Sequence, residues 1–354
     1  MRTLSSPIPL SSPIPLALMV LRAVMLALLA GPFLLAATEL ARAACEGRDL
    51  RPVLRAEAPE LMDAAMRDAA ATPNGSHRLW RVTAPGGAVG HLYGTMHVSD
   101  PTIVALSPEA QAAYDGAATV VIETTDVLDE AAAGAALMSR PDLMAFTDGR
   151  TLLDFLDKGE SEALDAALRG RGMTLEGVKA LKPWVLLGTL ALPACEATDR
   201  DAFLDIALAR DALRDGRAVE GLETAVEQLE AMAGLPLEMH VDGLLGSALL
   251  GDRMDDVFRT MGLMYREGEI GGIWPVLQAV SAHVAPGSEM NEADVVAFEE
   301  AVVTRRNHTM AERAAPLFNA GGAFVAVGAL HLPGEEGLVA LLRDAGYAVE
   351  PVAR

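Results

Sequence analysis

Short apolar runs alternate with amphipathic stretches along the chain, a pattern typical of an α/β fold. The range 45–71 has helical spacing and predicts one apolar face formed by Leu54, Leu61, Ala65 and Met66. Residues 78–94 predict a hairpin, because two strand-like runs flank the turn sequence Ala84-Pro85-Gly86-Gly87. These two elements open the folded part of the chain.

Further strands are predicted at four places, at 118–122, 217–222, 323–327 and 347–349. Ser107-Pro108 and Thr224-x-x-Glu227 have the form of helix starts, and the range 336–344 predicts a short helix. Residues 128–320 otherwise show the three-to-four spacing of helices. The chain therefore predicts an α/β fold with a mixed central sheet and flanking helices.

The first 43 residues have the features of a secretory signal peptide. An apolar stretch runs from Ala17 to Ala37, and the small-x-small sequence Ala41-Arg42-Ala43 follows it. Arg22 and Gly31-Pro32 interrupt the stretch, which disfavours a permanent membrane span. We expect an exported, periplasmic or extracellular protein with a mature domain over 44–354.

Export affects the interpretation of the two cysteines, Cys45 and Cys195. In an oxidising compartment they are the only possible intramolecular pair, and a disulfide is the favoured prediction. Two unpaired buried thiols are the alternative.

Composition narrows the choice of function. Of the residues, 51% are hydrophobic, which excludes a disordered chain because there is ample apolar surface to bury. The formal net charge is −21. So acidic a surface also argues against nucleic acid as a partner, because a phosphate backbone repels it.

Two histidines have the same sequence setting. His97 ends Gly94-Thr95-Met96-His97 and His331 ends Gly328-Ala329-Leu330-His331, each directly after an apolar strand. Glu123 ends a third buried strand. Ligand crevices form at the carboxyl ends of strands in α/β sheets, so these side chains predict one cleft. The large helical segment, approximately 128–320, is inserted between the two Gly-x-x-His halves and is predicted to cap that cleft.

Two histidines and one glutamate are a common ligand set for a catalytic divalent metal. Arg306 could reach the same cleft to hold an oxyanion, or it could complement a helix end. Glu223 could support the site or simply begin a helix. Each motif taken alone is also compatible with a structural residue.

Several segments resemble the TraB/GumN family, which is related to the Tiki metalloproteases. They are HLYGTMHVSD (91–100), VVIE (120–123), KPW (182–184), GLETAVEQ (221–228), RNHTM (306–310) and VGALHLPGEEGLVALLRDAGY (327–347). The resemblance implies a divalent-metal-dependent hydrolase, a peptidase in Tiki-like members. It makes His97 and His331 the metal or catalytic histidines, Glu123 the essential acid and third metal ligand, and Arg306 the cleft arginine. Manganese or cobalt is the metal that it suggests.

The predicted function is an exported metal-dependent hydrolase, with peptide or protein substrates. Glu123, if it is not a ligand, would be the general base. The alternative is a non-catalytic cell-envelope protein that binds a metal, haem or small ligand in the same cleft. A structural or regulatory protein that uses its helices as an interface is a third candidate. The sequence leaves the substrate and the oligomeric state open.

Overall fold

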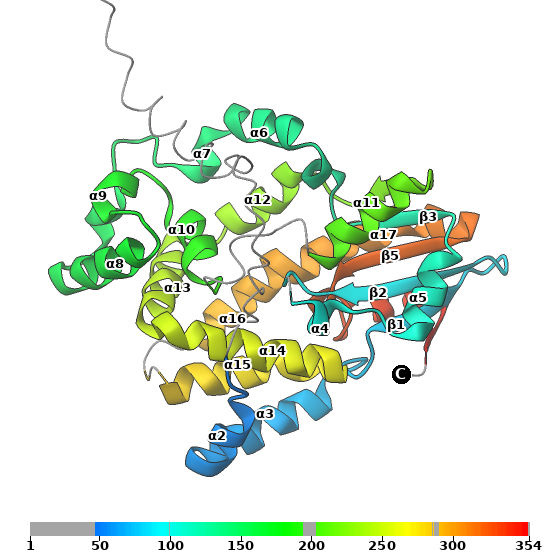
Figure 1. Ribbon diagram of the computed structural model, residues 1–354, viewed down its shortest axis with the longest axis horizontal. Helices are drawn as coiled ribbons and strands as arrows, with labels where there is room; N and C mark the ends of the chain where they lie inside the picture. Colours follow the sequence, from blue (N-terminus) through cyan, green and yellow to red (C-terminus); the bar gives the residue numbers. More distant parts are fainter. Residues whose placement is uncertain (1–46, 99, 194–202, 285, 287–289, 353–354) are drawn as a thin grey trace, which may run out of the picture. The chain divides into compact units, whose positions relative to one another are not determined.

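The computed structural model describes residues 47–98, 100–193, 203–284, 286 and 290–352 (Figure 1). The predicted leader, Cys45 and Cys195 lie outside the described residues. Six strands form one mixed sheet in the order β4-β3-β5-β2-β1-β6. Their bounds are β1 Leu79–Thr83, β2 Val89–Thr95, β3 Thr119–Ile122, β4 Ala218–Gly221, β5 Ala323–Gly328 and β6 Ala348–Pro351. The predicted mixed α/β sheet is confirmed.

Four neighbouring strands, β4, β3, β5 and β2, run parallel. The predicted hairpin is confirmed, because β1 pairs antiparallel with β2, and β1 also pairs antiparallel with β6. In the parallel register Thr95 lies opposite Gly328, and Ile122 lies opposite Ala326. The carboxyl ends of β3, β5 and β2 therefore meet at the same edge.

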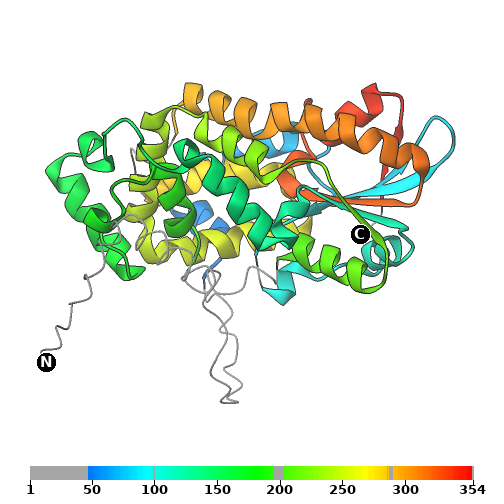
Figure 2. The ribbon, with the colours of Figure 1, turned by 90° about the horizontal axis from the view of Figure 1, so that it is seen from above.

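Helices cover both faces of this sheet, as Figure 2 shows with α17 (Arg305–Ala320) and α18 (Leu338–Asp344) on one side. Val121, Val325 and Val327 of the sheet pack against these two helices. The alternate positions Val120, Ile122 and Phe324 face α5 (Pro108–Asp115) and α11 (Leu204–Arg214) on the other side. Burial on both faces explains why β3 and β5 are continuous apolar runs.

The first predicted helix is two helices, α2 (Arg51–Glu57) and α3 (Pro59–Ala71). Proline disfavours helical geometry at the residue before it, and Ala58 accordingly leaves the helix at φ −142°. The break changes the buried face. Met62 and Ala65 are buried, whereas the predicted core residues Leu61 and Met66 are 37% and 41% exposed.

The remaining helices lie mostly in residues 128–320, where they follow the predicted pattern and β4 is the only named strand of the described part; α4 and η7 lie outside this range. They are α4 Pro101–Val104, η1 Thr125–Leu128, α6 Glu130–Ser139, α7 Pro141–Met144, η2 Leu152–Phe155, α8 Lys158–Gly170, α9 Leu175–Val178, α10 Pro183–Leu190, α12 Ala225–Ala233, α13 Leu237–Leu250, η5 Gly251–Arg253, α14 Met254–Glu267, α15 Ile270–Val284, α16 Glu292–Phe298, η6 Glu299–Thr304 and η7 Ala329–His331.

The helix starts predicted at Ser107-Pro108 and Thr224 are confirmed, whereas the helix predicted over 336–344 begins at Leu338. The hydroxyl of Ser107 accepts a hydrogen bond from the amide of Ala110, and Thr224 and Glu227 form a capping box. No helix of the described residues is both long enough and apolar enough to cross a bilayer.

Candidate functional site

Three of the predicted site residues follow neighbouring strands. Glu123 comes directly after β3, His331 ends η7 just after β5, and His97 lies two residues after β2. Since these strands are adjacent and parallel, the structure places all three residues at the same sheet edge, as the sequence predicts.

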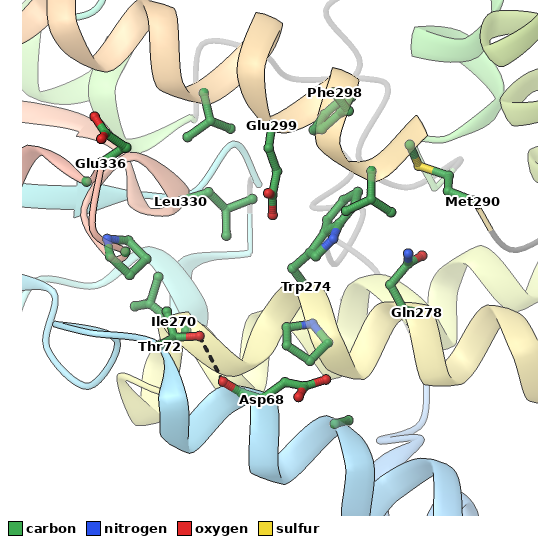
Figure 3. A pocket seen from close by; sticks show the side chains of 18 of the residues that line it. Asp68, Thr72, Ile270, Trp274, Gln278, Met290, Phe298, Glu299, Leu330 and Glu336 are labelled. Atoms are coloured by element: carbon green, nitrogen blue, oxygen red, sulfur yellow. Dashed lines mark hydrogen bonds between the residues drawn. The ribbon is translucent and has the colours of Figure 1, made fainter. Parts of the chain in front are cut away.

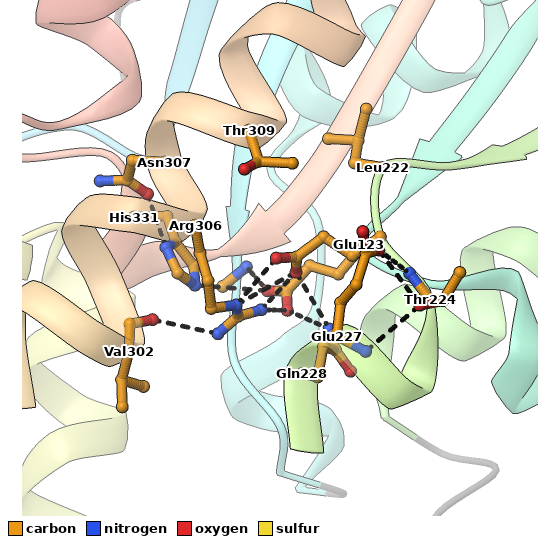
Figure 4. Close-up of polar contacts among 12 residues, drawn as sticks. Glu123, Leu222, Thr224, Glu227, Gln228, Val302, Arg306, Asn307, Thr309 and His331 are labelled. Atoms are coloured by element: carbon orange, nitrogen blue, oxygen red, sulfur yellow. Dashed lines mark hydrogen bonds and ion pairs between the residues drawn. The ribbon is translucent and has the colours of Figure 1, made fainter. Parts of the chain in front are cut away.

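Glu123 is 7% exposed, and both of its carboxylate oxygens accept hydrogen bonds. Oε1 accepts from the amide of Gly328 at 2.7 Å, and Oε2 accepts from Arg306 Nη2 at 2.6 Å and Gln228 Nε2 at 3.0 Å (Figure 4). A Cβ at position 328 would lie 3.1 Å from Oε1, so glycine permits this close approach.

Burial alone would raise the pKa of Glu123. The positive charges of His331 and His97 when protonated, the guanidinium of Arg306 and the Gly328 amide outweigh burial and lower that pKa to about 2. The carboxylate is therefore ionised at neutral pH.

Arg306 lies between two carboxylates. Its Nη2 contacts Glu123 at 2.6 Å and Glu223 at 2.7 Å, and its Nε donates to Glu223 at 3.1 Å. Nη1 donates to the carbonyl of Val302 at 3.2 Å. Most of its N–H groups are thus committed within the protein, and the second N–H of Nη1 is the one without an acceptor among the described residues.

The position of Arg306 in its helix differs from the sequence-based interpretation. It lies at the start of α17 and not near the C-terminal end of a helix. The prediction that Arg306 complements the dipole at a helix C-terminus is therefore wrong. The preceding turn, η6, is a π-helix. Such turns are rare and often occur at functional sites. A basic residue at this position is explained by the two glutamates that it contacts.

His331 is buried, and its hydrogen bonds fix its tautomer. The Asn307 amide nitrogen donates to the Glu336 carbonyl at 2.7 Å, so the Asn307 oxygen faces the imidazole. Nδ1 of His331, at 2.7 Å from that oxygen, must therefore carry the proton. Nε2 is left with its lone pair, 3.8 Å from Oε1 of Glu123. Burial lowers the pKa of His331 to about 4, which keeps the ring neutral.

His97 is oriented differently. Its Nε2 lies 3.3 Å from Oδ2 of Asp205 on α11, and its ring stacks on Phe203 with centroids 5.8 Å apart. Desolvation lowers the pKa of His97, but the hydrogen bond and charge of Asp205 outweigh it in this half-exposed ring and raise the pKa to about 9. Its charge influences the pKa values of both Glu123 and His331, so His97 belongs to the same electrostatic site.

The charges of this site do not cancel. Glu123, Glu223 and Asp205 are each paired, but among the described residues the cations that they face are two, Arg306 and protonated His97. One negative charge remains, in a largely buried setting where an uncompensated charge is costly. The lone pair of His331 Nε2 and Oε1 of Glu123 face each other across this region.

The donors fit a divalent metal in their chemistry, but only two of the three predicted ligands face each other. His97 is paired with Asp205 instead. Among the described residues, no group of three or more histidine, cysteine, aspartate or glutamate side chains is arranged to hold a metal ion. The structure thus brings Glu123, Arg306 and His331 into one cluster and places His97 beside it.

Four supporting residues were not assigned a definite role from the sequence. They are Asp205, Glu223, Gln228 and Asn307. Asp205 had a detectable signal, because it falls among Leu204, Leu208 and Ala209 on the buried face of its helix. An acid on an apolar helix face requires a partner.

The fold and site define a mixed α/β protein with a buried acid–arginine–histidine cluster at the carboxyl edge of its parallel strands. A family comparison then identifies the group. The TraB/PrgY/gumN family model matches residues 78–351, and the chain belongs to this family. The chain matched no curated protein and no solved structure in the other two comparisons.

Proposed function

We propose that this chain is an exported metal-dependent hydrolase that acts on peptides. The single observation that carries the proposal is the pair of facing acceptors, His331 Nε2 and Glu123 Oε1, in a cluster with one excess negative charge. Two acceptors at 3.8 Å do not bond to each other, and a cation between them satisfies both. The predicted leader is the basis for export.

In this proposal His331 and Glu123 hold the metal, whereas His97, the third ligand that the sequence predicts, pairs with Asp205 and takes a different role. A bound divalent ion lowers the pKa of a water and polarises a carbonyl. Asn307 keeps the His331 ring oriented through Nδ1, a supporting contact typical of ligating histidines. Protonated His97, held by Asp205, is the group that can donate a proton to a leaving amine.

Glu123 is better suited to hold a cation than to act as a general base. Its pKa of about 2 makes it a weak proton acceptor, and both of its oxygens already accept hydrogen bonds. Arg306 primarily balances Glu123 and Glu223, with one Nη1 N–H left for an oxyanion.

The test is metal analysis of the purified protein together with hydrolysis of a peptide library. We expect metal-dependent cleavage that is lost in His97→Ala and His331→Ala. His308→Ala is the matched control, because His308 is an exposed residue of α17 that pairs with Glu336. Metal binding without cleavage would support the binding-protein alternative, and absence of both would refute the proposal.

A further inference from the structure

A cavity of about 800 Å³ lies between α3, α15, the helix formed by α16 and η6, and the loop after η7 (Figure 3). This volume falls within the range of small-ligand sites. The walls are mainly apolar and include Leu61, Ile270, Trp274, Met290, Phe298 and Leu330. An apolar hollow of this size is suited to an apolar ligand.

Trp274 provides an aromatic ring on the cavity wall. Its indole stacks on Phe298, with centroids 5.4 Å apart and planes at 5°. Its Nε1–H is buried and has no acceptor among the described residues. Because this N–H is buried, it presents no surface to a ligand in the cavity, and Trp274 contributes its ring to the apolar wall.

The charges around the cavity are all negative. Figure 3 shows Asp68 on α3 and Glu299 on η6 on opposite walls, with the Glu299 carboxylate directed into the space. None of the described lining residues is a lysine, arginine or histidine, and Glu299 has no ion pair with a described residue. Such walls repel anions and favour a positive group.

One residue connects this cavity to the site described above. Asn307 lines the cavity and also holds Nδ1 of His331 at 2.7 Å. Leu330, the neighbour of His331 in sequence, lines the cavity as well. The cavity and the acid–arginine–histidine cluster therefore share a wall.

We propose that this cavity recognises the substrate, and that the substrate is a hydrophobic peptide that carries an ammonium group. The apolar side chains of the peptide fill the cavity, and its ammonium group pairs with Glu299 or Asp68. This inference rests on the proposed peptide hydrolysis, because it names the substrate class of the same site.

The test uses three peptide amides that differ only in charge, namely Leu-Leu-Phe amide with a free amine, its acetyl form and its succinyl form. Binding of these peptides to the His97→Ala protein is measured by calorimetry. This variant is expected not to cleave the peptides, and it should fold because the side chain that it loses is half exposed. The free amine should bind roughly tenfold more tightly than the succinyl form.

Cavity variants in the same background test the location. Ala64→Leu fills the cavity from α3 and should weaken binding roughly fivefold or more. Ala70→Leu, at an exposed position of the same helix, should leave binding unchanged.

The two proposals fail in different ways. No binding of the free-amine peptide, equal binding of all three peptides, or unchanged binding by Ala64→Leu would overturn the cavity proposal, even if the wild type cleaves peptides. Expected binding without any cleavage by the wild type would overturn the hydrolase, while the preference of the cavity for a hydrophobic peptide with an ammonium group would stand.

Discussion

Replacement of Arg306 with methionine should lower the free energy of unfolding by about 3–5 kcal/mol near pH 7. The side chain of Arg306 is 14% exposed, and those of Glu123 and Glu223 are 9% and 3% exposed. Methionine has a similar length but leaves two buried carboxylates without their cation. The loss is a large fraction of the about 5–15 kcal/mol that stabilises a typical domain.

Urea denaturation followed by circular dichroism measures this effect. Arg313→Met is the matched control on the same helix, because Arg313 and Glu227 form an ion pair with side chains 43% and 39% exposed. Solvent screens that pair, so its loss should cost about 1 kcal/mol or less. A comparable loss in the two variants would contradict the argument from burial.

The pH dependence gives a second, independent measure. In the wild type the pKa of Glu123 is about 2 in the folded state and about 4.5 when unfolded, so its contribution is complete above 4.5 and declines as the pH falls towards 2. Without Arg306 the pKa of the Glu123 carboxyl should rise. The variant should then gain stability as the pH falls from neutral towards 5, relative to the wild type. Parallel pH profiles would refute the reasoning.

Three further outcomes are expected. Asn307→Leu should reduce peptide turnover about 10–100-fold in steady-state kinetics, because His331 loses its Nδ1 partner. Asn307→Asp keeps an acceptor and should lose far less activity. Equal losses in the two variants would contradict the role of Asn307 in orienting His331. Asp205→Asn should lower the pKa of His97 from about 9 towards 6.5 in an NMR titration, and an unchanged value would show that Asp205 is not its partner. Gly94→Ala should cost about 1–3 kcal/mol in urea denaturation, since its Cβ would lie 2.9 Å from Ala329 Cα, whereas Gly134→Ala meets no atom within 4 Å and should cost nothing.

The sheet edge was predictable because its signals are local. Each of Glu123, His97 and His331 follows an apolar run, and the carboxyl ends of buried parallel strands meet at one edge. The alternation of faces in β3 and β5 depends only on the period of two in a strand. Local pattern was sufficient for these elements.

The supporting residues were not predictable in the same way, because they come from helices whose position depends on tertiary packing. Asn307 reaches His331 only because α17 packs on the sheet through Met310 and Phe318. The π-helix before Arg306 also leaves no trace in the apolar periodicity, which continues from Val295 to Met310. The wrong assignment of the buried face of α3 has a similar origin. The break in the helix at Ala58 rotates the following residues relative to the continuous helix that the sequence predicts.

The two Gly-x-x-His segments are alike in sequence and differ in what their glycines and histidines do. Gly94 allows β2 to pack against η7, whereas Gly328 donates its amide to Glu123. The histidines differ as well. His331 is buried, neutral and oriented by an amide, while the half-exposed His97 pairs with an acid that raises its pKa. The metal-dependent hydrolase that we propose would use a neutral nitrogen to hold a cation and a protonated group to donate, so two segments of one pattern can supply two different chemical functions.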